Sequence, residues 1–399
     1  MGLWEQWSGK AVRLTDGSFW KGFFGLGNAA GKTVTVDTAM QLDAVWACVK
    51  LISETVGTLP CIVYNASSTT IRKDHPLYEL VHDAPSLDNT AVEFWEAIAL
   101  SLMLYGNAFA EKKMSGDRLT ALNILHPACI NVSRNSRNER VYTVTEEGKQ
   151  RKIGEDRMFH VRGMSFGGDV GFSPVSFGRQ TLGSAIAAEE MAGKMFANGM
   201  QVSGVLTSDQ ILKPDQRKQL GETLNQFAGS DRAGKVAVLE SGLKYQQLSI
   251  NPQDAQMLET RRFSVEQICR WFGVPPVMIG HAAAGVTTWG SGVEQIILQF
   301  TKTGLRPILR RIEAAIRRDL MSAEDRKNIK VEFSMEGLLR GDSATRMAFI
   351  TGMVDHGIYT PNEGRAYENK EPRAGGDDLI VNQAMLPLRL LGKAPAKVG

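Results

Sequence analysis

Residues 25–33 contain the first side chains that could do chemistry, because glycines followed by Lys32 and a hydroxyl residue are typical of phosphate-binding loops. The spacing does not fit that motif, since the glycine required five residues before Gly31 is replaced by Leu26. Residues 34–36 do not resemble a helix start, so the helix amides that bind phosphate are not expected. We therefore predict a flexible arm here and no nucleotide site.

A serine-hydrolase motif is matched at 163–167, where Ser165 occupies the nucleophile position of the pattern G-x-S-x-G. A strand is expected before it. In hydrolases a helix follows the serine directly, but here residues 168–171 intervene. His160 also lies too close along the strand for the usual chain order of a triad. A glycine-rich strand exit is the simpler interpretation, and we predict no catalytic residue.

Metal-type spacings are absent from the sequence. His75 and His82 are separated by Pro76 and are expected to be ordinary surface histidines. The cysteines lie far apart and are expected to be buried thiols in a reducing compartment; they are Cys48, Cys61, Cys129 and Cys269. We therefore predict no metal and no cofactor.

Two groups of positive side chains lie on predicted helices. Arg261 and Arg262 fall within the apolar arc of a helix, where they must be paired or face water-filled space. An ion pair across a subunit interface is favoured slightly over contact with DNA. The second group most simply forms a solvated face of a later helix; it comprises Lys302, Arg306, Arg310 and Arg317. The net charge of +3 is too weak to indicate nucleic-acid binding by bulk attraction.

A loop of small and hydroxylated residues, 281–292, surrounds a lone tryptophan, Trp289. A helix must end just before it, because Gly273 is followed by Val274 and two prolines, which lack the amide proton. A long amphipathic helix is expected after it. We predict that this loop moves and contacts something that passes by.

Length and composition indicate a soluble protein with several subdomains. The chain has 399 residues, which is long for one core. The hydrophobic fraction of 43% and charged fraction of 22% are typical of globular proteins. No secretory signal is visible. The most apolar run, 94–110, is shorter than a membrane span and contains Glu96, so we expect a buried helix.

The first half of the chain is expected to be α+β. An arm covers 1–37, and a helix runs from about Ala39 to Gly57, followed by a strand at 61–64. A capping box, Thr90 with Glu93, begins a second helix that Gly106 ends. Short strands separated by polar turns are predicted for 108–162.

A projection is expected in the middle of the chain. Ser173 and Pro174 begin a helix that runs to about 199 and contains several glycines, which predicts close approach of another backbone. A small domain with strands and a helix at 214–227 follows. The helix at 253–272 then returns, so two helices carry a small domain at their tip.

The last third is expected to be mainly helical. The helix from Gly292 to about Leu320 should be kinked at Pro307. A strand at 329–333 and two C-terminal helices follow, the second begun by the capping box Thr360 with Glu363.

The ordered set of short motifs over about residues 40–380 resembles the portal proteins of tailed bacteriophages, in the family typified by phage HK97. No single motif is diagnostic, but their order along the chain is specific. The segments are Ala44–Val49 with Leu59-Pro60; His75-Pro-Leu; Tyr105–Phe109; His160-Val-Arg with Gly171–Pro174; Phe196–Gly199; Val238–Gly242; Phe272–Pro276; Arg340-x-Asp342; and Asn362-Glu-x-Arg365.

The resemblance implies a cyclic ring, a dodecamer, at one capsid vertex. Double-stranded DNA would pass through its axial channel during packaging and ejection. The implied partners are further copies of the chain, the terminase large subunit, the major capsid protein and a head–tail connector or adaptor, with no membrane. The implied location is the virion, and the host cytoplasm during assembly.

The portal fold would divide the chain into named parts. These are an N-terminal arm (1–39), a wing (40–172), a first stem helix (173–199), a clip (200–251), a second stem helix (252–280), a tunnel loop (281–292), a long kinked helix with a wing strand (293–340), and a crown with a C-terminal tail (341–399).

Three sets of site residues follow from that division. The tunnel loop would present Thr287, Thr288, Trp289 and Ser291 to DNA, and the stem would present Arg261 and Arg262. The clip would dock the terminase or connector through Lys213, Arg217, Lys218, Asp231 and Arg232. The alternative class is an enzyme, either an ATPase or a serine hydrolase, which would need a nucleotide loop or a triad in the right context.

Overall fold

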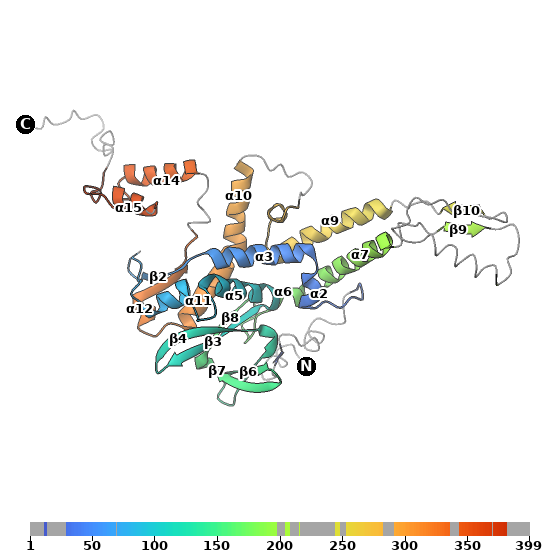
Figure 1. Ribbon diagram of the computed structural model, residues 1–399, viewed down its shortest axis with the longest axis horizontal. Coiled ribbons are helices and arrows are strands. Elements are labelled where there is room, and N and C mark those ends of the chain that lie inside the picture. The colour runs from blue at the N-terminus through green and yellow to red at the C-terminus, as the bar shows by residue number, and fades with distance from the viewer. Residues whose placement is uncertain are drawn as a thin grey trace, which may run out of the picture. The chain divides into compact units, whose positions relative to one another are not determined.

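The computed structural model describes residues 12–13, 29–68, 70–197, 204–207, 215, 244–247, 253–281, 291–335, 343–368 and 370–380 (Figure 1). The chain divides into two compact units, Met1–Phe333 and Ser334–Gly399. The first unit mixes helices and sheets, and the second is helical, so the α+β expectation is confirmed.

Two antiparallel sheets and one strand pair build the framework of the first unit. One sheet has the order β4–β3–β8 and the other has the order β1–β5–β6–β7, while β2 pairs with β11. The strands are β1 (Val12–Arg13), β2 (Cys61–Asn65), β3 (Asn107–Ser115), β4 (Arg118–Leu125), β5 (Ile130–Arg134), β6 (Arg140–Glu146), β7 (Lys149–Gly154), β8 (Met158–Arg162) and β11 (Ile329–Phe333). The strands predicted for 61–64, 108–162 and 329–333 are confirmed.

Helices pack on the β4–β3–β8 sheet, where α5 (Ala91–Tyr105) contacts all three strands (Figure 1). The helices α3 (Asp43–Thr58) and α5 pack against each other, and Gly57 allows the contact because a Cβ there would lie 2.9 Å from the Val92 carbonyl oxygen. The side chain of Trp95 on α5 is buried and its indole N–H donates to the Val81 carbonyl at 2.8 Å. Short helical turns at Pro76–Tyr78 (α4) and Glu79–Asp83 precede α5.

Local capping signals were located correctly by the sequence. Thr90 and Glu93 form the predicted capping box, and Gly106 ends α5 in the left-handed region with φ of +70°. Thr360 and Glu363 form the second capping box at the start of α15 (Pro361–Tyr367).

Two expectations for the N-terminal region need correction. The first helix is split into α2 (Val36–Met40) and α3, separated by Gln41 and Leu42. The predicted arm also contains ordered contacts, because β1 pairs with β5 and the Ala29 amide donates to Gln180 at 3.0 Å. These hydrogen bonds to a sheet edge and to a helix leave no periodic pattern of apolar residues in the sequence. The sequence analysis therefore could not predict them.

The middle of the chain contains a pair of helices that lie side by side, α7 (Arg179–Ala197) and α9 (Gln253–Phe272) (Figure 1). The predicted start at Ser173 is confirmed as the N-cap of a short helix, α6 (Pro174–Phe177). Gly178 separates α6 from α7, which corrects the single long helix expected from 173 to 199. Between α7 and α9 in the chain, β9 (Gly204–Thr207) pairs antiparallel with β10 (Lys244–Gln247).

The long helix predicted from 292 to 320 is interrupted. It consists of α10 (Ser291–Gln299), a π-helical turn (Phe300–Leu305) and α11 (Arg306–Asp319). Pro307 stands in the first turn of α11, where a missing amide proton costs little. The expected irregularity at Pro307 is therefore a π turn before the proline rather than a bend inside a continuous α-helix. A short helix, α12 (Asp325–Asn328), precedes β11.

The second unit holds α14 (Ser343–Asp355) and α15, which contact each other. Asn362 on α15 fixes the segment that follows: its amide oxygen accepts from the Arg373 amide at 2.8 Å, and its amide nitrogen donates to Arg373 and Asp377. Among all described residues, none belongs to a helix long and apolar enough to cross a membrane.

Candidate functional site

The predicted tunnel loop lies mostly outside the described residues. Thr287, Thr288 and Trp289 belong to that part, and Ser291 is the first residue of α10. The predicted docking residues of the clip are also outside the described residues; they are Lys213, Arg217, Lys218, Asp231 and Arg232. The structure does describe His281, the first residue of the predicted loop, together with α9 before it and α10 from Ser291 onwards. In the predicted clip it describes β9 and β10.

A tight turn fixes the residues just before the loop. α9 ends at Phe272, and Gly273 adopts φ of +68°, as the Gly-Val-Pro-Pro stop predicted. A short 3₁₀ helix, Pro276–Ile279, follows and ends at Gly280 with φ of +77°. The His281 amide then donates to the Pro276 carbonyl at 3.1 Å. The chain therefore leaves α9 through a hydrogen-bonded turn that ends at His281.

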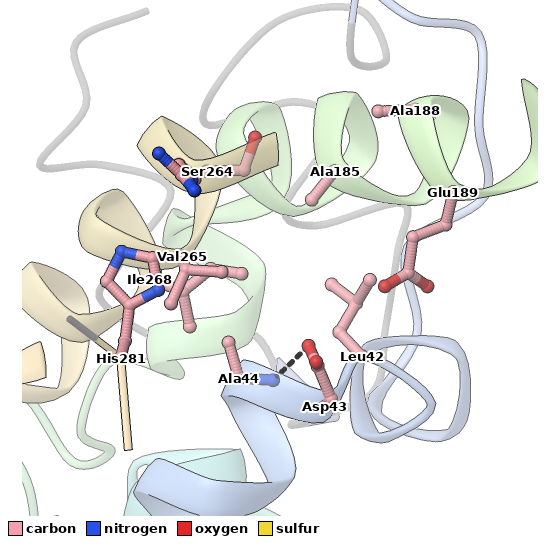
Figure 2. A pocket seen from close by; sticks show the side chains of 11 residues that line it. Leu42, Asp43, Ala44, Ala185, Ala188, Glu189, Ser264, Val265, Ile268 and His281 are labelled. Atoms are coloured by element: carbon pink, nitrogen blue, oxygen red, sulfur yellow. Dashed lines mark hydrogen bonds between the residues drawn. The ribbon is translucent and has the colours of Figure 1, made fainter. Parts of the chain in front are cut away.

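A cavity of about 170 Å³ lies beside this turn (Figure 2). Residues of α3, α7 and α9 line it together with the loop-bordering His281: Leu42, Asp43, Ala44, Ala185, Ala188, Glu189, Arg262, Ser264, Val265, Ile268 and His281. His281 Nε2 is 4.0 Å from Glu266 Oε1, and Glu266 also lies 3.6 Å from Arg270. These partly exposed contacts are worth about 1 kcal/mol or less each. Within the lining, ionisable side chains lie among the apolar residues of α3, α7 and α9; they are Asp43, Glu189, Arg262 and His281.

Arg262 lines this cavity and is exposed. Its side chain therefore faces solvent in the single chain. The sequence analysis expected an arginine on an apolar arc either to be paired or to face water-filled space, and the second applies here. Nothing is described of the Arg261 side chain beyond its place in α9. The structure brings Arg262 and His281 to one cavity, at the end of α9 from which the loop departs.

The structure bears on the two arguments made against a phosphate loop at residues 25–33. One argument against it was wrong, because a helix does begin at Val36, with Thr35 as its N-cap. That helix has only five residues, and its capping box already satisfies the amide of Thr38. Lys32 forms an ion pair with Glu190 on α7. The failed glycine spacing still argues against a nucleotide site.

His160 is buried within a hydrogen-bonded cluster. Its Nε2 donates to Asn107 Oδ1 at 3.1 Å, and Nδ1 accepts from the Tyr142 hydroxyl at 3.2 Å. Burial, with Arg162, Arg318 and Arg140 nearby, lowers the pKa of His160 well below its ordinary value. The ring is therefore neutral with both nitrogens occupied, which leaves it unable to serve as the base for Ser165.

The same cluster positions the loop after β8. Asn107 Oδ1 also accepts from the Gly171 amide at 2.7 Å, and Asn107 Nδ2 donates to the Gly171 carbonyl at 2.9 Å. No helix begins until Pro174. Residues 163–171 are thus a fixed glycine-rich strand exit, as the sequence indicated.

A contact between two thiols was missed by the sequence. Cys48 on α3 and Cys269 on α9 are both buried, and their Sγ atoms lie 3.9 Å apart although the residues are 221 positions apart in the chain. Helical periodicity places each cysteine on the apolar face of its helix, but only the packing of α3 on α9 brings them together. Across the described part of the chain, no group of three or more potential ligands is placed to hold a metal ion.

Comparisons with known proteins identify relatives over most of the chain. The family model described as phage portal protein matches residues 43–369. The portal protein of Enterobacteria phage HK97 is 34% identical over 373 residues, which cover 92% of this chain and 87% of that protein.

Two solved structures share the fold. A chain in the neck of a native GTA particle, computed with C12 symmetry, has a TM-score of 0.60 at 20% identity and covers 87% of this chain and 97% of its own. An HK97-family phage portal protein from Corynebacterium diphtheriae has a TM-score of 0.58 at 17% identity, covering 79% of this chain and 98% of its own. At these identities the likeness concerns the fold.

Proposed function

Because the chain belongs to the phage portal protein family, we propose that it assembles into a closed ring whose axial channel conducts double-stranded DNA. The ring would stand at one vertex of the capsid, for packaging, head–tail joining and ejection. A ring of identical copies needs a heterologous interface that closes on itself. The C12 symmetry of the related GTA neck supports twelve copies.

The observation that carries this proposal is the order of parts within the matched residues. The helices α7 and α9 lie side by side, with the β9–β10 pair between them in the chain. α9 then ends at a fixed turn, and residues 282–290 lead to α10. This order supports the assignment of a stem, a clip and a tunnel loop.

Within that ring, residues 281–292 would line the channel. Thr287, Thr288 and Ser291 offer hydroxyl groups to phosphates, and Trp289 offers bulk at a constriction. Such contacts recognise the DNA backbone and carry no sequence information. The segment contains no lysine or arginine, so each subunit would bind DNA weakly. Weak binding suits a channel, because each neutralised phosphate deepens the electrostatic well that DNA must leave.

The clip would dock the terminase large subunit and later a head–tail connector. Its charged residues supply contacts of both signs: Lys213, Arg217, Lys218, Asp231 and Arg232. The major capsid protein would contact the ring at the vertex. Assembly would take place in the host cytoplasm, and the finished ring would remain in the virion.

An enzyme is the competing class. The 34% identical relative from Enterobacteria phage HK97 is named as a portal protein. Neither the glycine-rich residues 25–33 nor Ser165 has the neighbouring groups that catalysis needs. ATP turnover by the purified ring without the terminase would support the competing class.

Deleting residues 285–288 tests the proposed channel role. We expect rings to form normally, because the deletion lies beyond the fixed turn at His281, and we expect packaging or retention of the genome to fail. A matched control replaces the same four residues by a glycine–serine segment of equal length, which keeps the reach of the loop. Full-length genome packaged and retained by the deletion variant would show that the loop is only a connector. The channel contact would then have to be sought at Arg261 and Arg262.

A further inference from the structure

The contact between Cys48 and Cys269 joins two helices with different places in the fold. Cys48 lies in the middle of α3, and Cys269 lies one turn before the end of α9. The two Sγ atoms are 3.9 Å apart, and both side chains are almost completely buried. A disulfide has a sulfur–sulfur distance of about 2.05 Å. The sulfur atoms would therefore need to approach by about 2 Å, a distance within reach of small side-chain and backbone shifts.

The cavity of about 170 Å³ is lined by residues of α3 and α9 that lie one helical turn from the two cysteines. Ala44 precedes Cys48 by one turn of α3, and Val265 precedes Cys269 by one turn of α9, so both helices present the same faces to the cavity and to the thiol contact. Figure 2 shows Ala44 beside Val265 and Ile268. A water molecule occupies about 30 Å³ in the liquid, so the cavity has room for a small oxidant one helical turn from the two cysteines.

The two thiols are not equivalent. Cys48 Sγ donates its hydrogen bond to Cys269 Sγ. Accepting this bond lowers the pKa of Cys269, whereas donating it, together with burial, raises the pKa of Cys48. Since the thiolate is the nucleophile, Cys269 is the sulfur expected to react first.

We propose that Cys48 and Cys269 form an oxidisable thiol pair, which a hydroperoxide converts into a disulfide that fastens α9 to α3. The Cys269 thiolate attacks the terminal oxygen of the hydroperoxide, and the O–O bond breaks to give a sulfenic acid and an alkoxide, or hydroxide when the oxidant is hydrogen peroxide. The Cys48 sulfur then attacks the sulfenic sulfur, and the thiol proton leaves with the hydroxyl group as water. The peroxide is reduced by two electrons and the two thiols lose them.

The bond would act on the end of α9 from which the chain passes to His281 and residue 282. α9 contacts α3 and α7, so a covalent link to α3 would fix this end of the helix pair to the body. This inference does not depend on the proposed DNA conduit.

Peptide mapping after peroxide treatment tests the proposal. Full-length protein would be treated with hydrogen peroxide, alkylated at the remaining thiols and digested without reduction. We expect the Cys48 and Cys269 peptides to be linked, with two of the four thiols lost and a mass decrease of about 2 Da per chain. The thermal midpoint should rise, because the link closes a very long loop, and a reductant should reverse every change.

Single variants separate the pair from the other cysteines. Cys61→Ser changes a buried cysteine outside the pair and should form the same linked peptide. Cys48→Ser should leave a sulfenic acid at position 269 that dimedone traps; Cys48→Ala serves if that variant does not fold.

Three outcomes would overturn the proposal. The first is oxidation of the partly exposed Cys129 while Cys48 and Cys269 remain reduced. The second is a linked peptide that contains any other pair. The third is sulfenic acid at Cys269 of the wild type without a disulfide.

Discussion

At the scale of single residues, Gly106 brings the end of α5 into close contact with the segment after β8. Its φ is +70°, and a Cβ added to it would fall on the carbonyl group of Phe172. Its own carbonyl accepts from the Gly163 amide at 2.8 Å. The residue therefore combines a left-handed conformation with close contact between two backbones, a combination that only glycine allows.

Gly106→Ala should lower the free energy of unfolding by about 3 kcal/mol or more, because conformational strain and a backbone clash add together. Gly116→Ala is the matched control: its φ is +61°, but a Cβ there meets nothing within 4 Å. The control substitution should lower the free energy of unfolding by only about 1–2 kcal/mol. Denaturant midpoints of the two variants measure the difference, and equal losses would contradict the importance of the contact with Phe172.

His160 should make stability depend on pH. In the fold its pKa lies well below the ordinary 6.5, so the ring remains neutral, whereas the unfolded chain binds a proton below about pH 6.5. The contribution of His160 to the free energy of unfolding is therefore fully present above that pH. It falls as the pH decreases, by up to about 1.4 kcal/mol per pH unit.

His160→Gln should flatten this dependence, since glutamine has no proton to gain. Unfolding of both proteins between pH 7.5 and 5 would measure it. An unchanged slope in the variant would place the titrating group elsewhere.

Single residues also show which contacts could be predicted from the sequence. The capping boxes at Thr90 and Thr360 and the helix end at Gly106 were predictable, because each signal lies within a few residues of chain. The bonds between Asn107, Tyr142 and His160 join three strands. They follow from strand register, which no local pattern specified.

At the scale of elements, the end of α9 is held against the π-helical turn. A Cβ on Gly304 would lie 2.8 Å from the Gly273 carbonyl oxygen and 2.9 Å from the Phe300 ring. Gly273 is the residue at which the chain leaves α9. The two glycines therefore allow the backbone before residues 276–281 to pass close to the turn that precedes α11.

Gly304→Ala should destabilise the protein by about 1–3 kcal/mol through overpacking of this crossing. The control, Gly193→Ala on α7, has open space around the added Cβ. It should stabilise the helix by about 0.5–1 kcal/mol. Thermal unfolding of the two variants should shift in opposite directions; a shift in the same direction would argue against close packing at Gly304.

Elements were predicted well where their pattern was periodic and poorly where tertiary contact decides. α5, α9 and β11 agree with the sequence prediction because their apolar spacing is regular. Gly178 divides α6 from α7, and a Cβ on it would lie 3.4 Å from the Trp271 ring, which belongs to a segment distant in the sequence. The π turn before Pro307 contains Gly304, whose close approach to Gly273 likewise joins residues distant in the sequence.

At the scale of the whole molecule, the ordered motifs predicted the family although no motif was diagnostic alone. The candidate site was only partly predictable. Arg262 was singled out by its position on an apolar arc, whereas its meeting with His281 at one cavity required the packing of α3, α7 and α9. Among the glycines of α7, Gly183 is buried within the chain itself, whereas Gly193 is exposed.

The central claim is that identical chains close into a ring around a channel. End-on electron micrographs of the purified full-length protein test it most directly. We predict closed rings with a central opening and a uniform number of subunits, the proposed number being twelve. Only monomers or dimers across all protein and salt concentrations, or open filaments without closure, would contradict the account.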